Sequence, residues 1–285
     1  MIRVFPRKTK WTPTDDLAFV GDPPLLRPPD QRVHISVTFT WDLCEGQRLL
    51  DAWRRYYPDV RIGGPVLTGP DDYPDEFVPG RYIKPGVTFT SRGCPKSCPW
   101  CLARRREGLL QELPVYPGYI IQDNNFLACS QAHCEEVYAM LAEQTGVAFK
   151  GGLDIDYLTP WHVDRIKALP SVDELWVACD AKWQLPRMDK AAGLLADFSI
   201  EKRFCYALIG FGDDTPDKAT ARCEAILAKG FLPFVQYYRP PDIALWERGV
   251  VPWSPAEWTE VIRKWSRPAF YRAKPKPLET PLWKT

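Results

Sequence analysis

Residues 94–101 read CPKSCPWC and place three cysteines, Cys94, Cys98 and Cys101, within eight positions. Thiolates bind zinc and iron–sulfur clusters, and three of them so close together can converge on one small metal centre. A ferredoxin holds each cubane cluster with four cysteines, so a three-cysteine site leaves one iron with an open coordination position. A second molecule can be held and reduced at such an iron.

The spacing C-x3-C-x2-C, with an aromatic residue directly before the third cysteine, resembles the signature of the radical S-adenosylmethionine enzymes. The resemblance implies that Cys94, Cys98 and Cys101 hold a [4Fe-4S] cluster whose unique iron chelates the amino and carboxylate groups of S-adenosylmethionine. It implies that an electron, from a donor such as flavodoxin or ferredoxin, splits the sulfonium. The resulting 5′-deoxyadenosyl radical would abstract hydrogen from a substrate that the motif does not identify. Trp100 corresponds to the residue near the adenine.

Zinc is the alternative metal that the same cysteines could bind. A zinc site needs a fourth Cys or His at comparable spacing, and the nearest, Cys129, His133 and Cys134, lie beyond an intervening predicted helix. The alternative function is a zinc- or cluster-containing nucleic-acid-binding protein without radical chemistry. In such a protein, residues 104–106 and the basic termini would contact phosphate groups. Three unrelated buried cysteines fit less well, because the surrounding prolines and glycine make a poor helix or strand interior.

The composition predicts a folded protein in a reducing compartment. The 285 residues are 45% hydrophobic and 13% aromatic, enough for a sizeable core. Nine cysteines, an odd number, fit poorly with a disulfide framework. We find no signal peptide and no apolar run long enough to span a bilayer, so we expect a cytoplasmic protein without membrane contact.

The formal net charge is +1, but the charges are unevenly placed. Residues 1–11 carry four basic side chains and no acid, and residues 263–285 carry seven basic side chains against Glu279 alone. These ends could contact nucleic acid, although solvated tails are the commoner interpretation of such runs.

From residue 86 onward, short apolar strands alternate with helices, which predicts parallel strands joined by crossover helices. The predicted strands are 87–90, 119–122, 148–155, 174–179, 204–209 and 232–238, and the main helices are 131–144, 160–169 and 216–229. Six such units resemble the partial (βα)6 barrel of the radical family, over residues 85–245. Residues 246–285 would add one amphipathic helix, 255–266, and a basic tail.

The part before the barrel, residues 1–84, is predicted to be an arm and one βαβ unit. The proline-rich first thirty residues favour an extended arm, and strands at 33–39 and 60–64 flank a helix at 45–57. The unit resembles the end of the cobalamin-binding domain found in one branch of the family, where a strand also ends in Gly-Gly-Pro. The chain has no Asp-x-His-x-x-Gly segment and too few residues for a whole Rossmann-like domain, so we expect no cobalamin and interpret His34 as a core residue.

Polar residues follow several predicted strands, where parallel α/β proteins place their ligands. The family holds the amino group of S-adenosylmethionine after strand two, where this chain has Asp123, Asn124 and Asn125 instead of the common Gly-Gly-Glu. Their acceptor oxygens suit an ammonium group. The family usually meets the ribose and carboxylate from strands four and five, so Asp180 is the candidate there.

Three further positions are candidates on the basis of their places in the predicted strands. Gly210 resembles the glycine of strand five that contacts adenine, but it could also simply end that strand. Gln236, near the end of strand six, could line the barrel. Gly151 marks close approach by a ligand or another backbone, and the nearby Asp154 and Asp156 either face inward to bind a ligand or face solvent.

Overall fold

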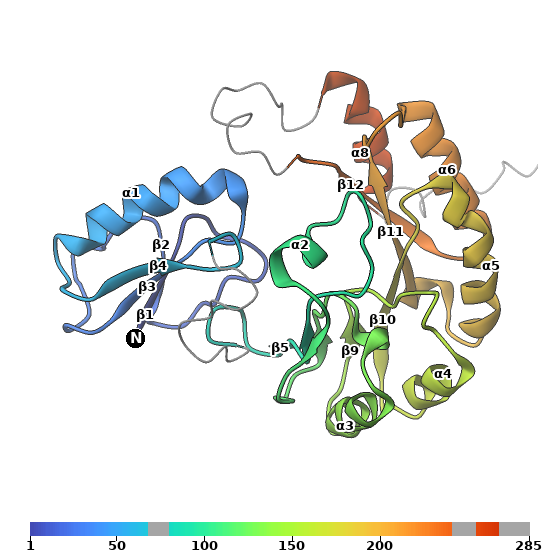
Figure 1. Cartoon of the computed structure of the whole chain (residues 1–285), viewed down its shortest axis with the longest axis horizontal. Coiled ribbons are helices and arrows are strands. Elements are labelled where there is room, and N and C mark those ends of the chain that lie inside the picture. The colour runs from blue at the N-terminus through green and yellow to red at the C-terminus, as the bar shows by residue number, and fades with distance from the viewer. Residues whose placement is uncertain (68–79, 241–254, 268–285) are drawn as a thin grey trace, which may run out of the picture. The chain divides into compact units, whose positions relative to one another are not determined.

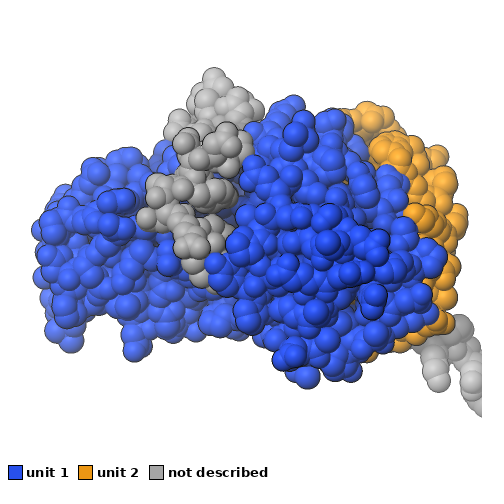
Figure 2. Space-filling view, turned by 60° about the horizontal axis from the view of Figure 1, so that its bottom comes forward, with its two compact units in different colours: residues 1–173, 240–251 blue, residues 174–239, 252–285 orange. Residues whose placement is uncertain are grey.

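The computed structural model describes residues 1–67, 80–240 and 255–267. The chain divides into two compact units, residues 1–173 with 240–251 and residues 174–239 with 252–285 (Figure 2). Both units are built mainly of parallel strands and helices, so the predicted α/β class is confirmed. None of the helices within the described ranges combines the length and the apolar character needed to cross a bilayer.

The first unit begins with a four-stranded parallel sheet, in the order β2-β1-β3-β4 (Figure 1). Its strands are β1 (Ile2–Phe5), β2 (Ala18–Val20), β3 (Val33–Ser36) and β4 (Val60–Gly63). Helix α1 (Leu43–Arg54) connects β3 to β4 and packs against both. The βαβ unit predicted from residues 33–64 is therefore present, with a slightly earlier helix.

The expectation that the first thirty residues form an arm without regular structure is wrong. Strand β1 pairs with β3 and is an inner strand of the sheet, and β2 pairs with β1 at the edge. The side chains of Ile2 and Val4 are completely buried. The prolines that suggested an arm lie outside the two strands, in the connections. A four-residue strand is too short to give a periodic signal, and its partner lies about thirty residues further along the chain.

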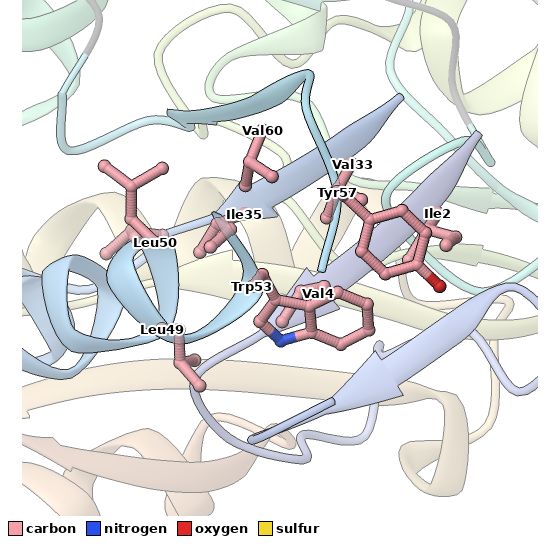
Figure 3. Close-up of a cluster of buried hydrophobic side chains, with 10 residues drawn as sticks. Ile2, Val4, Val33, Ile35, Leu49, Leu50, Trp53, Tyr57 and Val60 are labelled. Atoms are coloured by element: carbon pink, nitrogen blue, oxygen red, sulfur yellow. The ribbon is translucent and has the colours of Figure 1, made fainter. Parts of the chain in front are cut away.

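One face of this sheet forms an apolar core with α1 (Figure 3). Val33 and Ile35 of β3 belong to this core, whereas His34 points to the opposite face, as strand alternation requires. The Nδ1 atom of His34 lies 2.6 Å from the hydroxyl of Tyr82, and the two rings stack. His34 is therefore buried, as predicted, but on the face of the sheet opposite the core with α1.

The first unit continues with β5 (Val87–Thr88), β8 (Ile120–Ile121) and β9 (Val147–Phe149), parallel strands with β8 in the middle. Helix α3 (Gln131–Ala142) connects β8 to β9, and α4 (Pro160–Lys167) follows β9. The antiparallel strands β6 (Ser91–Arg92) and β7 (Gln111–Glu112) enclose the cysteine segment and α2 (Ala103–Glu107). This hairpin was not predicted, because two-residue strands carry no periodic pattern.

The second unit contains three parallel strands, β10 (Val172–Ala178), β11 (Arg203–Ile209) and β12 (Leu232–Tyr237), with β11 in the middle. Its helices are α5 (Leu185–Leu194), α6 (Pro216–Ala228) and α8 (Thr259–Trp265). The hydroxyl of Thr215 caps α6 by accepting from the Lys218 amide. Trp258 and Trp265 are buried where α8 begins and ends, whereas Trp246 and Trp253 lie outside the described residues.

Single 3₁₀ turns complete both units. They are η1 (Thr40–Asp42), η2 (Phe126–Ala128), η3 (Lys182–Gln184), η4 (Ile200–Lys202) and η5 (Ala256–Trp258). Such turns are common next to helix ends, and η1, η3 and η5 lead directly into α1, α5 and α8.

Trp53 lies in the core between α1 and the sheet, and its replacement tests how much that core contributes to stability. Its side chain is completely buried, its ring lies 5.6 Å from those of Phe19 and Tyr57, and its Nε1 donates to the Gly21 carbonyl. We expect Trp53→Ala to lower the free energy of unfolding by about 3–5 kcal/mol, measured by urea titration. The neighbouring Tyr56 is 53% exposed, so Tyr56→Ala should cost less than about 1 kcal/mol. Equal losses would contradict this assignment.

His162 makes the stability of the first unit dependent on pH. The residue is buried on α4, its Nδ1 lies 3.2 Å from the Tyr138 hydroxyl, and burial lowers its pKa. Below a pH of about 6.5 the unfolded chain takes up a proton that the folded chain resists, so unfolding is favoured as the pH falls. We expect urea midpoints to fall between about pH 7 and pH 5. His162→Gln should show a flatter pH profile; an identical slope would exclude this cause.

Candidate metal centre

The cysteine loop, residues 94–101, runs from β6 toward α2. Cys94 and Cys98 are partly exposed, Cys101 is exposed, and none of the three forms a disulfide. The Cys101 amide donates to the Cys98 carbonyl at 3.0 Å, so Pro99 and Trp100 occupy the centre of a tight turn between these cysteines. Proline is favoured at the first central position of such a turn. The sequence CPWC therefore sets the local geometry of the last two thiols.

The three thiols do not converge on one point. Within the described ranges, no group of three or more Cys, His, Asp or Glu side chains is gathered closely enough to hold a metal ion. The backbone of the first cysteine is held in place, because the Cys94 amide donates to the Gly108 carbonyl on the other side of the hairpin. Thiolates are soft ligands that suit iron–sulfur clusters and zinc, so the donor set itself is appropriate for either.

Asp123, directly after β8, holds the entry to the cysteine loop. Its carboxylate accepts hydrogen bonds from the Thr90 amide at 2.7 Å, the Thr90 hydroxyl at 2.6 Å and the Ser91 hydroxyl at 2.9 Å. The residue is only 1% exposed, and burial raises its pKa, against the effect of these donors. Both carboxylate oxygens are therefore already in use.

Asn124 and Asn125, the next two residues after Asp123, also contact the start of the cysteine loop. The Oδ1 atom of Asn124 accepts from the Gly93 amide at 3.1 Å. The Nδ2 atom of Asn125 lies 3.5 Å from the Cys94 sulfur and donates to Asp154 Oδ2 at 2.9 Å. This contact with a carboxylate fixes the orientation of the amide. The Oδ1 atom of Asn125 is buried and accepts no hydrogen bond from the described residues, which leaves one buried acceptor on the side chain whose Nδ2 lies beside Cys94.

Asp154 and Asp156 lie in the loop after β9, not in a strand, because β9 ends at Phe149. Both carboxylates bind Lys96, the central cation of the cysteine loop, at 2.6 and 2.8 Å. Burial alone would lower the pKa of Lys96, but the two carboxylates raise it. This pairing could not be predicted from the sequence, because the two aspartates lie 58 and 60 residues after Lys96 and no spacing pattern links them.

Gly151 explains why the loop after β9 can reach this place. A Cβ atom on Gly151 would lie 2.0 Å from the backbone oxygen of Asp123, so any side chain would collide with the segment that follows β8. The close approach that Gly151 predicted is therefore made by another part of the backbone. It brings Asp154 beside the residues that follow β8.

The candidates of the second unit lie at or near the carboxyl ends of its strands. Asp180 follows β10, and its Oδ1 accepts from the Leu208 amide at 2.9 Å. Gly210 follows β11 with φ of +78°, and a Cβ atom there would lie 2.5 Å from the Tyr237 ring. Gln236 is an exposed residue of β12. Asp180 and Gly210 thus both have local structural roles, and all three residues belong to the unit that does not contain the cysteine loop.

The residues considered as a fourth zinc ligand lie in the first turn of α3, His133 and Cys134, or just before it, Cys129. Burial raises the pKa of both Cys129 and Cys134 to about 12, so these thiols stay protonated at neutral pH. The His133 amide donates to Ser130, the N-cap of α3. A thiol must lose its proton to bind zinc, and burial makes that loss more costly for Cys129 and Cys134.

No protein-family model matches this chain, and no curated protein is significantly similar to it. The spacing of the cysteines and the contacts around them are therefore the basis for assigning an activity.

The buried carboxylate of Asp123 should control the order of the cysteine loop. Asp123→Asn removes the negative charge from these hydrogen bonds, and its Nδ2 can no longer accept from the Thr90 and Ser91 hydroxyls as Oδ2 does, so we expect a loss of about 2 kcal/mol in unfolding free energy. Limited proteolysis within residues 91–108 should accelerate as well. The matched control is Asp164→Asn on the exposed side of α4, which should change neither quantity. Unchanged proteolysis of Asp123→Asn would show that the loop does not depend on this carboxylate.

Proposed function

We propose that this chain is a radical S-adenosylmethionine enzyme. Its six βα units would form the partial (βα)6 barrel of that family, and Cys94, Cys98 and Cys101 would hold the [4Fe-4S] cluster. When bound, the cluster would supply the electron that cleaves S-adenosylmethionine and yields the 5′-deoxyadenosyl radical. The observation that carries the proposal is the C-x3-C-x2-C spacing, in a loop that follows β5 and is braced by residues after β8.

The residues of the loop fit a cluster in three respects. The three thiols are accessible or partly accessible and form no disulfides, so they are available as ligands. They lie in one short loop, so gathering them requires movement within residues 94–101. The Nδ2 atom of Asn125 already lies beside the Cys94 sulfur, and hydrogen bonds to sulfur are one of the means by which proteins set cluster potentials.

Asn125 is our candidate for the amino group of S-adenosylmethionine. Its buried Oδ1 accepts no hydrogen bond from the described residues and could receive an ammonium proton. The oxygens of Asp123 and the Oδ1 of Asn124 already accept backbone and hydroxyl donors, so these two residues would brace the site. Trp100, in the turn between two cysteines, would lie near the adenine.

The other expectations are part of the same proposal. Asp180 would meet the ribose or carboxylate, Gly210 the adenine, and Gln236 the interior of the barrel. A flavodoxin or ferredoxin would supply the electron in a reducing cytoplasm. The substrate is a molecule from which hydrogen can be abstracted, and no cobalamin is required.

Anaerobic reconstitution with iron and sulfide tests this proposal. We expect brown protein with broad visible absorption that forms 5′-deoxyadenosine from S-adenosylmethionine and dithionite. Cys94→Ala, Cys98→Ala and Cys101→Ala should each lose the absorption, nearly all iron and the product, because three thiolates are the smallest set that leaves one iron open. Cys129→Ala and Cys134→Ala are the matched controls and should retain iron.

Two results would contradict the proposal. A colourless protein that binds zinc would favour the nucleic-acid-binding alternative. Loss of iron in Cys129→Ala or Cys134→Ala would show that the ligand set is not the three-cysteine loop.

A further inference from the structure

Lys96 stands at the middle of the cysteine loop, between Cys94 and Cys98. Its neighbours Pro95 and Ser97 are exposed, whereas the Lys96 side chain is only 29% exposed. Its ammonium group lies 2.6 Å from Asp154 Oδ1 and 2.8 Å from Asp156 Oδ2, and 5.7 Å from the centre of the Tyr157 ring. The middle of the loop is thus attached to the segment that follows β9.

The segment that follows β9 is itself anchored in the core. Leu153 and Ile155 are 1% and 5% exposed, so the residues on both sides of Asp154 are anchored in the core. Asp154 Oδ1 also accepts from the Asp156 amide, and Asp154 Oδ2 accepts from Asn125. The carboxylate that Lys96 binds is therefore fixed from three directions.

We propose that Lys96 is a positioning residue whose clasp on Asp154 and Asp156 orders the cysteine loop before any metal is bound. A disordered loop would lose conformational entropy on gathering three thiols around a metal, and a loop that is ordered beforehand avoids most of that loss. Partly buried, charge-assisted hydrogen bonds to two carboxylates are suited to this task, whereas a single exposed pair is not. The purpose of the clasp rests on the proposed function, but its existence can be tested without it.

Hydrogen exchange of the reduced, metal-free full chain gives that test. Lys96→Met removes the ammonium group and keeps a side chain of similar length. We expect amides of residues 93–101 to exchange about tenfold faster, which corresponds to about 1.4 kcal/mol. Alkylation of Cys98 should accelerate in parallel, while Cys44, exposed on α1, serves as the internal standard and keeps its rate.

Three variants separate the clasp from a loss of charge. Lys96→Arg retains two-carboxylate binding and should restore slow exchange, at least in part. Lys218→Met removes a more exposed pair with Asp213 in the other unit and should leave the loop unchanged. Adding Asp156→Asn to Lys96→Met should give no further acceleration, because the two residues act through one contact.

The proposal is overturned if the amides and Cys98 of Lys96→Met exchange and alkylate at the rates of the parent protein. It is also overturned if amide exchange in α3 and alkylation of Cys44 accelerate as much as the loop, because that would indicate a general loss of stability. After reconstitution, Lys96→Met should take up iron more slowly than Lys96→Arg; equal rates would overturn the role in metal capture. If the parent protein binds no iron, the proposed function fails, and the metal-free exchange still decides whether the clasp exists.

Discussion

The local structure around the cysteines depends on one buried carboxylate. Because Asp123 is almost completely buried, its oxygens must be paired, and the donors that pair with them are the Thr90 amide and the Thr90 and Ser91 hydroxyls. The end of β8 and the exit from β5 are thereby held together. The backbone of Gly151 packs directly against Asp123, so the loop after β9 is positioned by the same residue.

The parallel arrangement of β5, β8 and β9 makes this convergence possible. Parallel neighbours end at the same edge, so segments that follow different strands meet there, although helices separate them in the sequence. The second unit follows the same rule with other residues: Asp180 after β10 accepts from β11, and Asp214 beyond β11 binds the buried Arg222 of α6. In each unit, a side chain beyond a strand is held by a neighbouring element.

Sequence reasoning succeeded where the determining interactions are local. Helix α6 was placed within one residue, because Thr215 and Pro216 mark its start, and the apolar run at 204–209 placed β11 to within one residue of its observed start at Arg203. The cysteine spacing was visible for the same reason. The strand at residues 2–5 and the hairpin at 91–92 and 111–112 were missed because their stability comes from distant partners. The place of Asp123, Asn124 and Asn125 after a strand was predicted, but their bonds to residues 90–94 could not be, since nothing in the sequence specifies which backbone groups face them.

The separation of the clasp partners along the chain has a consequence for synthesis. Lys96 binds aspartates that lie 58 and 60 residues later, and Thr90 binds an aspartate 33 residues later. Contacts of such length form late, because the chain between them must first be made and folded. On the ribosome, the three thiols therefore emerge well before the segments that order their loop. During that interval the cysteine loop lacks the contacts of Thr90 and Lys96 that order it in the folded chain.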